Sequence, residues 1–173
     1  MRDPRSTPKN PSVSLRVLRG CLLCLLLGAL AADVTAAELK IVRVFSGWRD
    51  AAAFKRISEY FDGQENTGGQ LVLRTHPEQR TGYYFLVRLA NHSAAVATKI
   101  ELELITPTSA KPVTYTFSAT LNSGDSVLNL GLTGPDWPDK KSNPVAWKIV
   151  VRAADGSQLT SDSSYLWEKP AQE

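Results

Sequence analysis

The chain is poor in the residues that most often carry chemistry. Of its 173 residues, two are cysteine and two are histidine. Cys21 and Cys24 both lie in the first 36 residues, and His76 and His92 each stand beside turn-forming residues. A catalytic triad needs a nucleophile, a base and an orienting group within mutual reach, and no Gly-x-Ser-x-Gly motif accompanies either histidine. We therefore predict no catalytic residue, no metal site and no cofactor.

An excess of charge of one sign is also missing from most of the chain. The first 36 residues hold five of the 20 basic residues and two of the 17 acidic ones, which leaves 15 of each sign in the remainder. A surface of mixed sign provides no field that attracts nucleic acid. Phosphate-binding glycine loops are absent. The acidic loop 62–69 lacks the ligand ladder of a calcium site. Two carboxylates would suffice for a glycan-acting hydrolase, but no pair stands out from the pattern.

The long apolar run of a membrane-spanning helix is missing as well. Basic residues precede an apolar run that extends from Gly20 to Ala32, about 13 residues, whereas a spanning helix needs roughly 20. Small residues follow at Val34-Thr35-Ala36. This order predicts a Sec-type signal peptide over residues 1–36, cleaved near Ala36 or Ala37, and a soluble periplasmic or secreted protein. An uncleaved anchor and lipidation at Cys21 are less favoured alternatives.

The residues that are present favour β-structure. Residues 99–106 alternate strictly, with Ile100, Leu102 and Leu104 on one face, and the dense apolar run 83–89 predicts a strand near the middle of a sheet. The first strand, 39–45, is predicted at an edge. Apolar residues spaced as in a helix predict a short helix over 50–61, although a strand over 56–61 remains possible. Further strands are predicted at 70–75, 113–118, 128–132, 145–153 and 157–167.

Seven short strands after residue 70, separated by turn residues, predict an antiparallel β-sandwich. Phe85–Asn91 running into Ile100–Leu104, followed by Leu121-Asn122-Ser123-Gly124, resembles bacterial immunoglobulin-like and fibronectin-type-III-like modules over residues 70–167. The resemblance implies an all-β, immunoglobulin-like fold and no particular function. Residues 37–69 are expected to form an extra strand, short helix and loop packed on the sandwich of residues 70–173.

In the last hairpin, the length of the loop decides which residues of the two strands share a face of the sheet. A two-residue turn at Asp155-Gly156 would set Ile149 opposite Asp162 and leave apolar residues on both faces. A three-residue loop, Ala154-Asp155-Gly156, places Ala153 opposite Ser157 instead. Such loops end with a residue of positive φ, which suits Gly156. We predict the three-residue loop.

Earlier in the chain, Asn91-His92-Ser93 matches the acceptor sequence for N-glycosylation.

The four tryptophans are the remaining candidates for function. Trp147 is in phase with Ile149 and Val151, which predicts a core position. Trp48 and Trp137 lie in irregular segments, and Trp167 ends the last predicted strand. These three either fill gaps over the core or form an aromatic surface, Trp137 first, that binds sugar rings or a protein partner.

From these features we predict an exported, non-catalytic binding or scaffolding protein of the cell envelope. A protein partner is favoured, with a carbohydrate-binding module as the alternative and a small glycan-acting hydrolase as the third choice. A bare apolar patch or an unpaired edge strand would favour a protein partner, whereas an exposed aromatic strip would favour sugar. Two carboxylates facing each other in a cleft would favour the hydrolase. The oligomeric state is not predicted.

Overall fold

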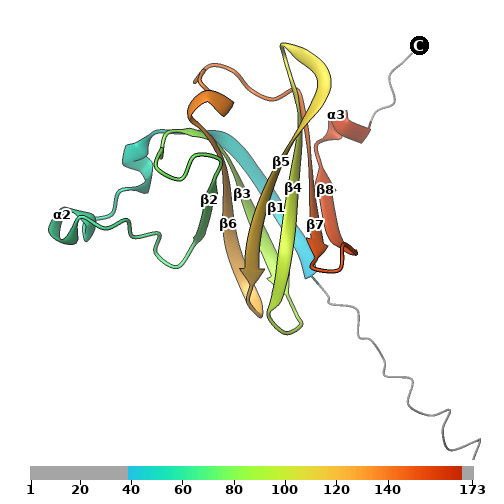
Figure 1. The fold of residues 1–173 in the computed structure, drawn as a ribbon, viewed down its shortest axis with the longest axis horizontal. Coiled ribbons are helices and arrows are strands. Elements are labelled where there is room, and N and C mark those ends of the chain that lie inside the picture. The colour runs from blue at the N-terminus through green and yellow to red at the C-terminus, as the bar shows by residue number, and fades with distance from the viewer. Residues whose placement is uncertain (1–38, 169–173) are drawn as a thin grey trace, which may run out of the picture. The chain divides into compact units, whose positions relative to one another are not determined.

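The computed structural model describes residues 39–168, apart from the side chains of Asp62 and Glu168, so the predicted signal peptide lies outside the described residues. Eight strands form two four-stranded sheets (Figure 1). The strands are β1 (Leu39–Arg49), β2 (Leu71–Arg74), β3 (Gly82–Asn91), β4 (Val96–Thr106), β5 (Ser109–Leu121), β6 (Gly124–Thr133), β7 (Ala146–Ala153) and β8 (Gln158–Ser163). The helical elements are single turns: η1 (Ala51–Phe54), α2 (Glu59–Asp62), η2 (Gly134–Asp136) and α3 (Tyr165–Glu168). No helix within residues 39–168 is long and apolar enough to span a bilayer.

The strand order identifies the fold as an immunoglobulin-like sandwich. One sheet has the order β1-β3-β6-β2 and the other has the order β5-β4-β7-β8. β1, β3 and β6 therefore hold the positions of strands A, B and E, and β4, β7 and β8 hold those of C, F and G. β5, beside β4, takes the place of strand C′. The predicted all-β, immunoglobulin-like fold is confirmed, as are the edge position of β1 and the interior position of β3.

β2 is the unusual strand. It pairs with β6 at the sheet position that strand D has in antibody constant domains, but it runs parallel to β6 and comes between strands A and B in the chain. The sequence interpretation treated the first strand as an addition to a sandwich that began near residue 70. In the structure β1 is a framework strand, and β2 is the addition.

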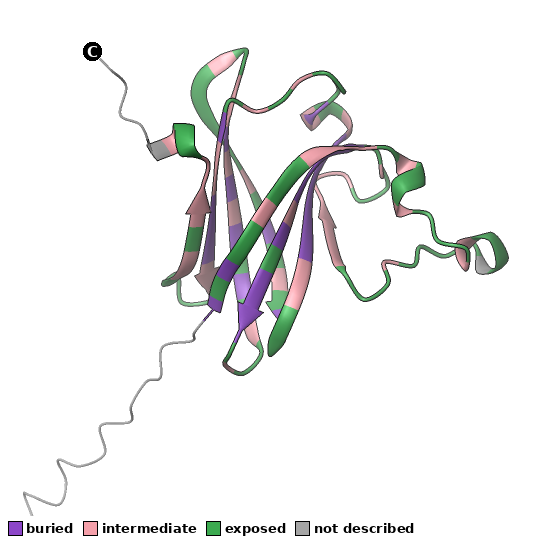
Figure 2. Cartoon of the chain, turned by 180° about the vertical axis from the view of Figure 1, so that it is seen from behind, coloured by how far each residue is buried: buried purple, intermediate pink, exposed green. Residues whose placement is uncertain are grey.

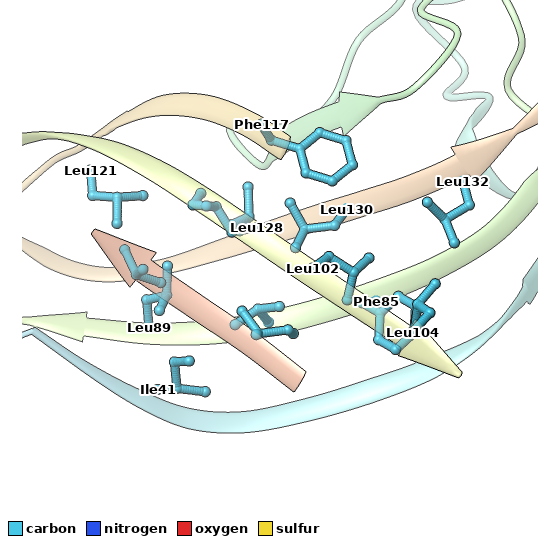
Figure 3. Close-up of a cluster of buried hydrophobic side chains, with 14 of the residues drawn as sticks. Ile41, Phe85, Leu89, Leu102, Leu104, Phe117, Leu121, Leu128, Leu130 and Leu132 are labelled. Atoms are coloured by element: carbon cyan, nitrogen blue, oxygen red, sulfur yellow. The ribbon is translucent and has the colours of Figure 1, made fainter. Parts of the chain in front are cut away.

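The core lies between the two sheets and follows the predicted alternation. Phe85, Val87 and Leu89 of β3 face inward, and each is at most 1% exposed. Opposite them lie the three apolar residues of β4 that the alternation of 99–106 placed on one face, all fully buried. Figure 3 shows these side chains meeting leucines from β6. Since burying each such side chain contributes about 1.5–3 kcal/mol, this layer is the main source of stability.

The predicted helix over residues 50–61 is wrong. The segment forms two separate turns, η1 and α2, with extended backbone at Lys55 between them. Of the three residues that suggested a helical stripe, only Phe54 packs on the sandwich, whereas Ile57 and Phe61 are 78% and 86% exposed. The apolar stripe does not form because each turn has only four residues, which is too short to bring side chains from both ends of the segment onto one surface.

The predicted loop of the last hairpin is confirmed, but the register beyond it is wrong. The Ala153 amide donates to the Ser157 carbonyl at 2.9 Å, and Gly156 has a φ of 87°. A β-bulge then shifts the pairing between Val151 and Arg152, so that Ile149 faces Asp162 after all. The extra residue is Leu159, which packs against the core. The bulge thus keeps the favourable loop and still turns Leu159 inward.

Asn91 ties the two turns at one end of the sandwich together. Its Nδ2 donates to the carbonyls of Ala94, Leu121 and Asn122 at 3.1–3.3 Å, while its Oδ1 accepts from the amide and hydroxyl of Ser93. The side chain is 1% exposed. The glycosylation acceptor sequence at Asn91 is therefore buried in the folded protein, and the residue has a structural role.

Replacing Asn91 by alanine should lower the free energy of unfolding by about 2–4 kcal/mol, because the buried Leu121 carbonyl and the partly buried carbonyls of Ala94 and Asn122 lose their donor. Urea unfolding followed by tryptophan fluorescence measures the change. Asn143→Ala, at an exposed loop position, is the matched control and should change stability by less than about 0.5 kcal/mol. A loss below about 1 kcal/mol for Asn91→Ala would show that water replaces these hydrogen bonds.

Candidate interaction site on the segment between β1 and β2

The segment 50–70, hereafter the excursion, connects the two opposite edges of the first sheet. β1 lies at one edge and β2 at the other, so the chain must cover three strand spacings, about 14 Å, before β2 begins. Near its start, Phe54 packs on Tyr84 of β3, and α2 then lies to the side of the sandwich (Figure 1). This path places a second, smaller cluster of contacts on the face of the sheet that points away from the core.

Tyr84 is the centre of that outer cluster. It lies on the outer face of β3, yet it is only 1% exposed because the excursion covers it. Its ring lies over Gly131 of β6, its register partner, and a Cβ at Gly131 would be 2.4 Å from the tyrosine ring. The Phe54 ring covers Tyr84 from the excursion side, at a centroid distance of 4.6 Å. Glycine at position 131 therefore makes room for the aromatic pair.

A network of ion pairs surrounds the two rings. The guanidinium of Arg74, on β2, donates from Nε to the Tyr84 hydroxyl at 2.9 Å and makes a bidentate ion pair with Glu65. The Tyr84 hydroxyl in turn donates to the Arg80 carbonyl at 2.7 Å. The Arg80 side chain pairs with Glu59 and lies 3.5 Å from Glu65. Both glutamates of the excursion are thus held by arginines from the segment that follows it.

The network keeps its carboxylates ionised. The hydrogen bond from Arg80 lowers the pKa of Glu59, and the hydrogen bond from Arg74 lowers the pKa of Glu65. Burial raises the pKa of the Tyr84 hydroxyl, which therefore stays protonated as a donor. The side chains of Arg74 and Glu59 are 6% and 7% exposed. Their partners Glu65 and Arg80 are 25% and 23% exposed, so each ion pair is partly covered and solvent screens it less than an ion pair whose two members are both exposed.

Beyond the network, the excursion presents three exposed apolar side chains, Ile57, Tyr60 and Phe61, hereafter the apolar tip. They are 78%, 74% and 86% exposed. The turn that carries them is built around Glu59, whose Oε1 accepts from the amides of Arg56 and Asn66 at 3.4 and 3.2 Å. Glu59 therefore points inward as an anchor while its neighbours Tyr60 and Phe61 face solvent.

Trp137, the first of the predicted binding residues, is 5% exposed and belongs to the core. Its ring packs on Tyr83 at a centroid distance of 5.1 Å, and its Nε1 donates to the Ser142 carbonyl at 3.2 Å. A side chain buried to this extent has no free face for stacking on a ligand, so the packing alternative describes Trp137.

Trp48 and Trp167 are both half-buried and lie on different elements. Trp48 is the register partner of Tyr83, packs against the core, and donates from Nε1 to Asp50 at 3.0 Å. Trp167 lies on α3, because β8 ends at Ser163 instead of continuing to Trp167 as predicted. Together with Tyr83 and Phe85, the aromatic residues Trp48, Trp137 and Trp147 close one end of the core.

The groups that suggest catalysis are engaged in structural contacts. His76 Nε2 lies 3.1 Å from Asp136, an arrangement seen in triads. However, no serine or threonine hydroxyl in the described part of the chain bonds to the imidazole, and the nearby Thr133 hydroxyl bonds to the His76 backbone. Between residues 39 and 168 there is no group of three His, Cys, Asp or Glu side chains that could hold a metal ion.

Comparisons with known proteins add only a likeness of fold. No protein-family model matches the chain, and no curated protein matches it. Among solved structures, the chain is similar to an immunoglobulin-like protein from Pseudomonas aeruginosa, with 15% sequence identity and a TM-score of 0.31. That match covers 75% of this chain and 96% of the other.

The excursion should loosen in acid before the sandwich unfolds. Glu59 and Glu65 have pKa values below the ordinary 4.5, so their stabilisation is complete above pH 4.5 and is lost as the pH falls through the folded values. In an NMR titration from pH 7 to 3, amide signals of residues 50–70 should shift or broaden while those of β3 and β6 persist. Glu59→Gln/Glu65→Gln should show loosened signals already at pH 7. Simultaneous loss of all signals would contradict an independently held excursion.

Trp137→Ala should lower the free energy of unfolding by about 3 kcal/mol or more, because the deletion leaves a cavity beside Tyr83. Trp167→Ala, at a half-buried position on α3, should cost less than half as much. Thermal unfolding of both variants by circular dichroism gives the comparison. Equal Tm values for Trp137→Ala and the wild type would be inconsistent with a core role for Trp137.

Proposed function

We propose that this protein is an exported, non-catalytic binding module of the cell envelope, and that its apolar tip inserts into a concave apolar pocket of a protein partner. The observation that carries the proposal is the combination of exposure and anchoring at the tip. Three large apolar side chains face solvent on one short turn. Exposed apolar patches on folded domains mark interaction sites, since nothing else offsets their contact with water.

The hydrogen bonds that anchor the turn favour the interpretation of the tip as a recognition surface and not as a loosely held loop. Glu59 holds the backbone at both ends of the tip and is itself paired with Arg80. The Asn66 side chain adds a hydrogen bond to the Ser58 hydroxyl at 2.9 Å. A turn that is already ordered loses less conformational entropy on binding, so more of the contact energy appears as affinity. Aromatic residues such as Tyr60 and Phe61 are also frequent anchors of protein interfaces.

The alternatives have less support. The tryptophans predicted to form a carbohydrate platform do not form one, because Trp137 is buried and Trp48 packs against the core. The exposed rings of Tyr60 and Phe61 lie on the tip together with the aliphatic Ile57. A glycan-acting hydrolase needs one protonated and one ionised carboxyl group. The two carboxyls gathered by Arg80, those of Glu59 and Glu65, both have lowered pKa values and are therefore both ionised at neutral pH.

The proposal predicts that Ile57→Ser/Tyr60→Ser/Phe61→Ser abolishes capture of a specific protein from envelope extract without changing Tm by more than about 2 °C, because the three side chains are exposed. A photo-crosslinking amino acid at position 61 should label that same protein. Tyr165→Ser is the matched control, since Tyr165 is 72% exposed, close to the 74% of Tyr60, and lies on α3 instead of the excursion.

A glycan array run with the same variants separates the outcomes. If the wild type binds a glycan and the triple variant does not, the tip recognises sugar and the protein-partner proposal fails. If the triple variant captures the same proteins as the wild type, the tip has no role in recognition.

A further inference from the structure

A second surface lies on the outer face of the same sheet, away from the apolar tip. Arg43 of β1 and Arg88 of β3 are direct register partners, so their side chains stand next to each other on the outer face. Lys40 pairs with Ala90, two residues further along β3, and therefore faces the same side. All three cations are exposed, and none forms an ion pair within residues 39–168. Figure 2 shows this side of the molecule, with exposed residues along β1.

This arrangement is unfavourable for stability. Like charges directly opposite each other on neighbouring strands repel and destabilise the pairing. Cations on an edge strand have a known protective use, because they discourage edge-to-edge aggregation, and this explains Lys40 and Arg43 on β1. It does not explain Arg88, which lies on an interior strand. The pair Arg43–Arg88 therefore calls for an anionic partner from outside the described chain.

A groove of about 620 Å³ adjoins Arg88. Its lining includes Val42 and Arg88, the backbone of Gly68 and Gly69, and the amide residues Gln70 and Asn122. Asp125 also contributes to the lining and is the one carboxylate there. The hydroxyl of Ser126, at the same groove, is buried and has no hydrogen-bond partner in the described residues. The groove thus offers a cation and several hydrogen-bonding groups.

The geometry points to an extended acidic segment of a protein as the ligand of this groove and of the Arg43–Arg88 pair. Guanidinium groups match carboxylates in a planar, bidentate geometry. Amide and hydroxyl groups along the groove suit the backbone of an extended peptide. Val42 is 59% and Phe45 46% exposed beside the arginines, which allows apolar side chains between the acids. Arg43 covers one face of the Phe45 ring, which disfavours sugar stacking.

The test uses a fluorescently labelled hexaglutamate peptide, with hexaglutamine as the neutral counterpart, titrated by fluorescence anisotropy at low salt. The wild type should bind hexaglutamate in preference to hexaglutamine. Arg43→Gln/Arg88→Gln should weaken hexaglutamate binding roughly tenfold, as expected for two exposed charge pairs. Lys111→Gln/Lys141→Gln removes the same net charge from exposed positions on β5 and the loop before β7, and should change affinity less than twofold.

Folding of the arginine variant can be checked independently. Since the substitution relieves repulsion, its Tm should equal or exceed that of the wild type, so lost binding would not reflect unfolding. Equal affinities of the two double variants, or equal binding of hexaglutamate and hexaglutamine by the wild type, would overturn the proposal. Stronger binding to phosphatidylglycerol vesicles or to oligogalacturonate than to hexaglutamate, lost in Arg43→Gln/Arg88→Gln, would assign the site to a membrane or to an acidic glycan instead.

Discussion

The contact between Tyr84 and Gly131 is the constraint on which the outer half of the first sheet depends. A sheet with one face in the core normally leaves its other face to solvent, and a tyrosine there needs no particular neighbour. Here the ring lies over a glycine, Gly131, and Phe54 of the excursion covers it. Because the Tyr84 hydroxyl bonds to both Arg74 and Arg80, the same residue joins β2 and the segment before β3. Without the Tyr84–Gly131 contact and the hydrogen bonds of the Tyr84 hydroxyl, the excursion would have no defined path.

The contacts around Tyr84 also explain how the protein can expose an apolar tip. Charged residues are usually found outside and apolar residues inside, but the excursion reverses this order. Its glutamates point inward to arginines, while Tyr60 and Phe61 point outward. The reversal is possible because the two arginines provide enough hydrogen bonds to compensate for covering the carboxylates.

Sequence reasoning predicted what alternation encodes and missed what depends on long-range partners. The strict pattern of β4 and the dense run of β3 identified the core, since residues on one face of a strand share one environment. The parallel pairing of β2 with β6 has no local signal, because it depends on where the excursion ends. Three residues have helical spacing but do not share one surface. Phe54 packs on Tyr84, whereas Ile57 and Phe61 face solvent. Trp137 was undecided, because the direction of an indole between two prolines depends on Tyr83, more than 50 residues away in the sequence.

The two sheets differ in the pairing of charges on their outer faces. On the second sheet, Lys99 and Arg152 are also register partners of like charge, but Glu101 accepts from Arg152 at 2.9 Å and lies 3.2 Å from Lys99. Both cations are therefore paired with an acid, and the pKa of Glu101 is lowered. On the first sheet, Arg43 faces Arg88 without an acid between them. If both faces served only solubility, the same pairing would be expected on each. The first sheet instead carries the anchored apolar tip at one end and unmatched cations along β1 and β3. We therefore expect contacts with partners to concentrate on this face, while the second sheet completes the sandwich.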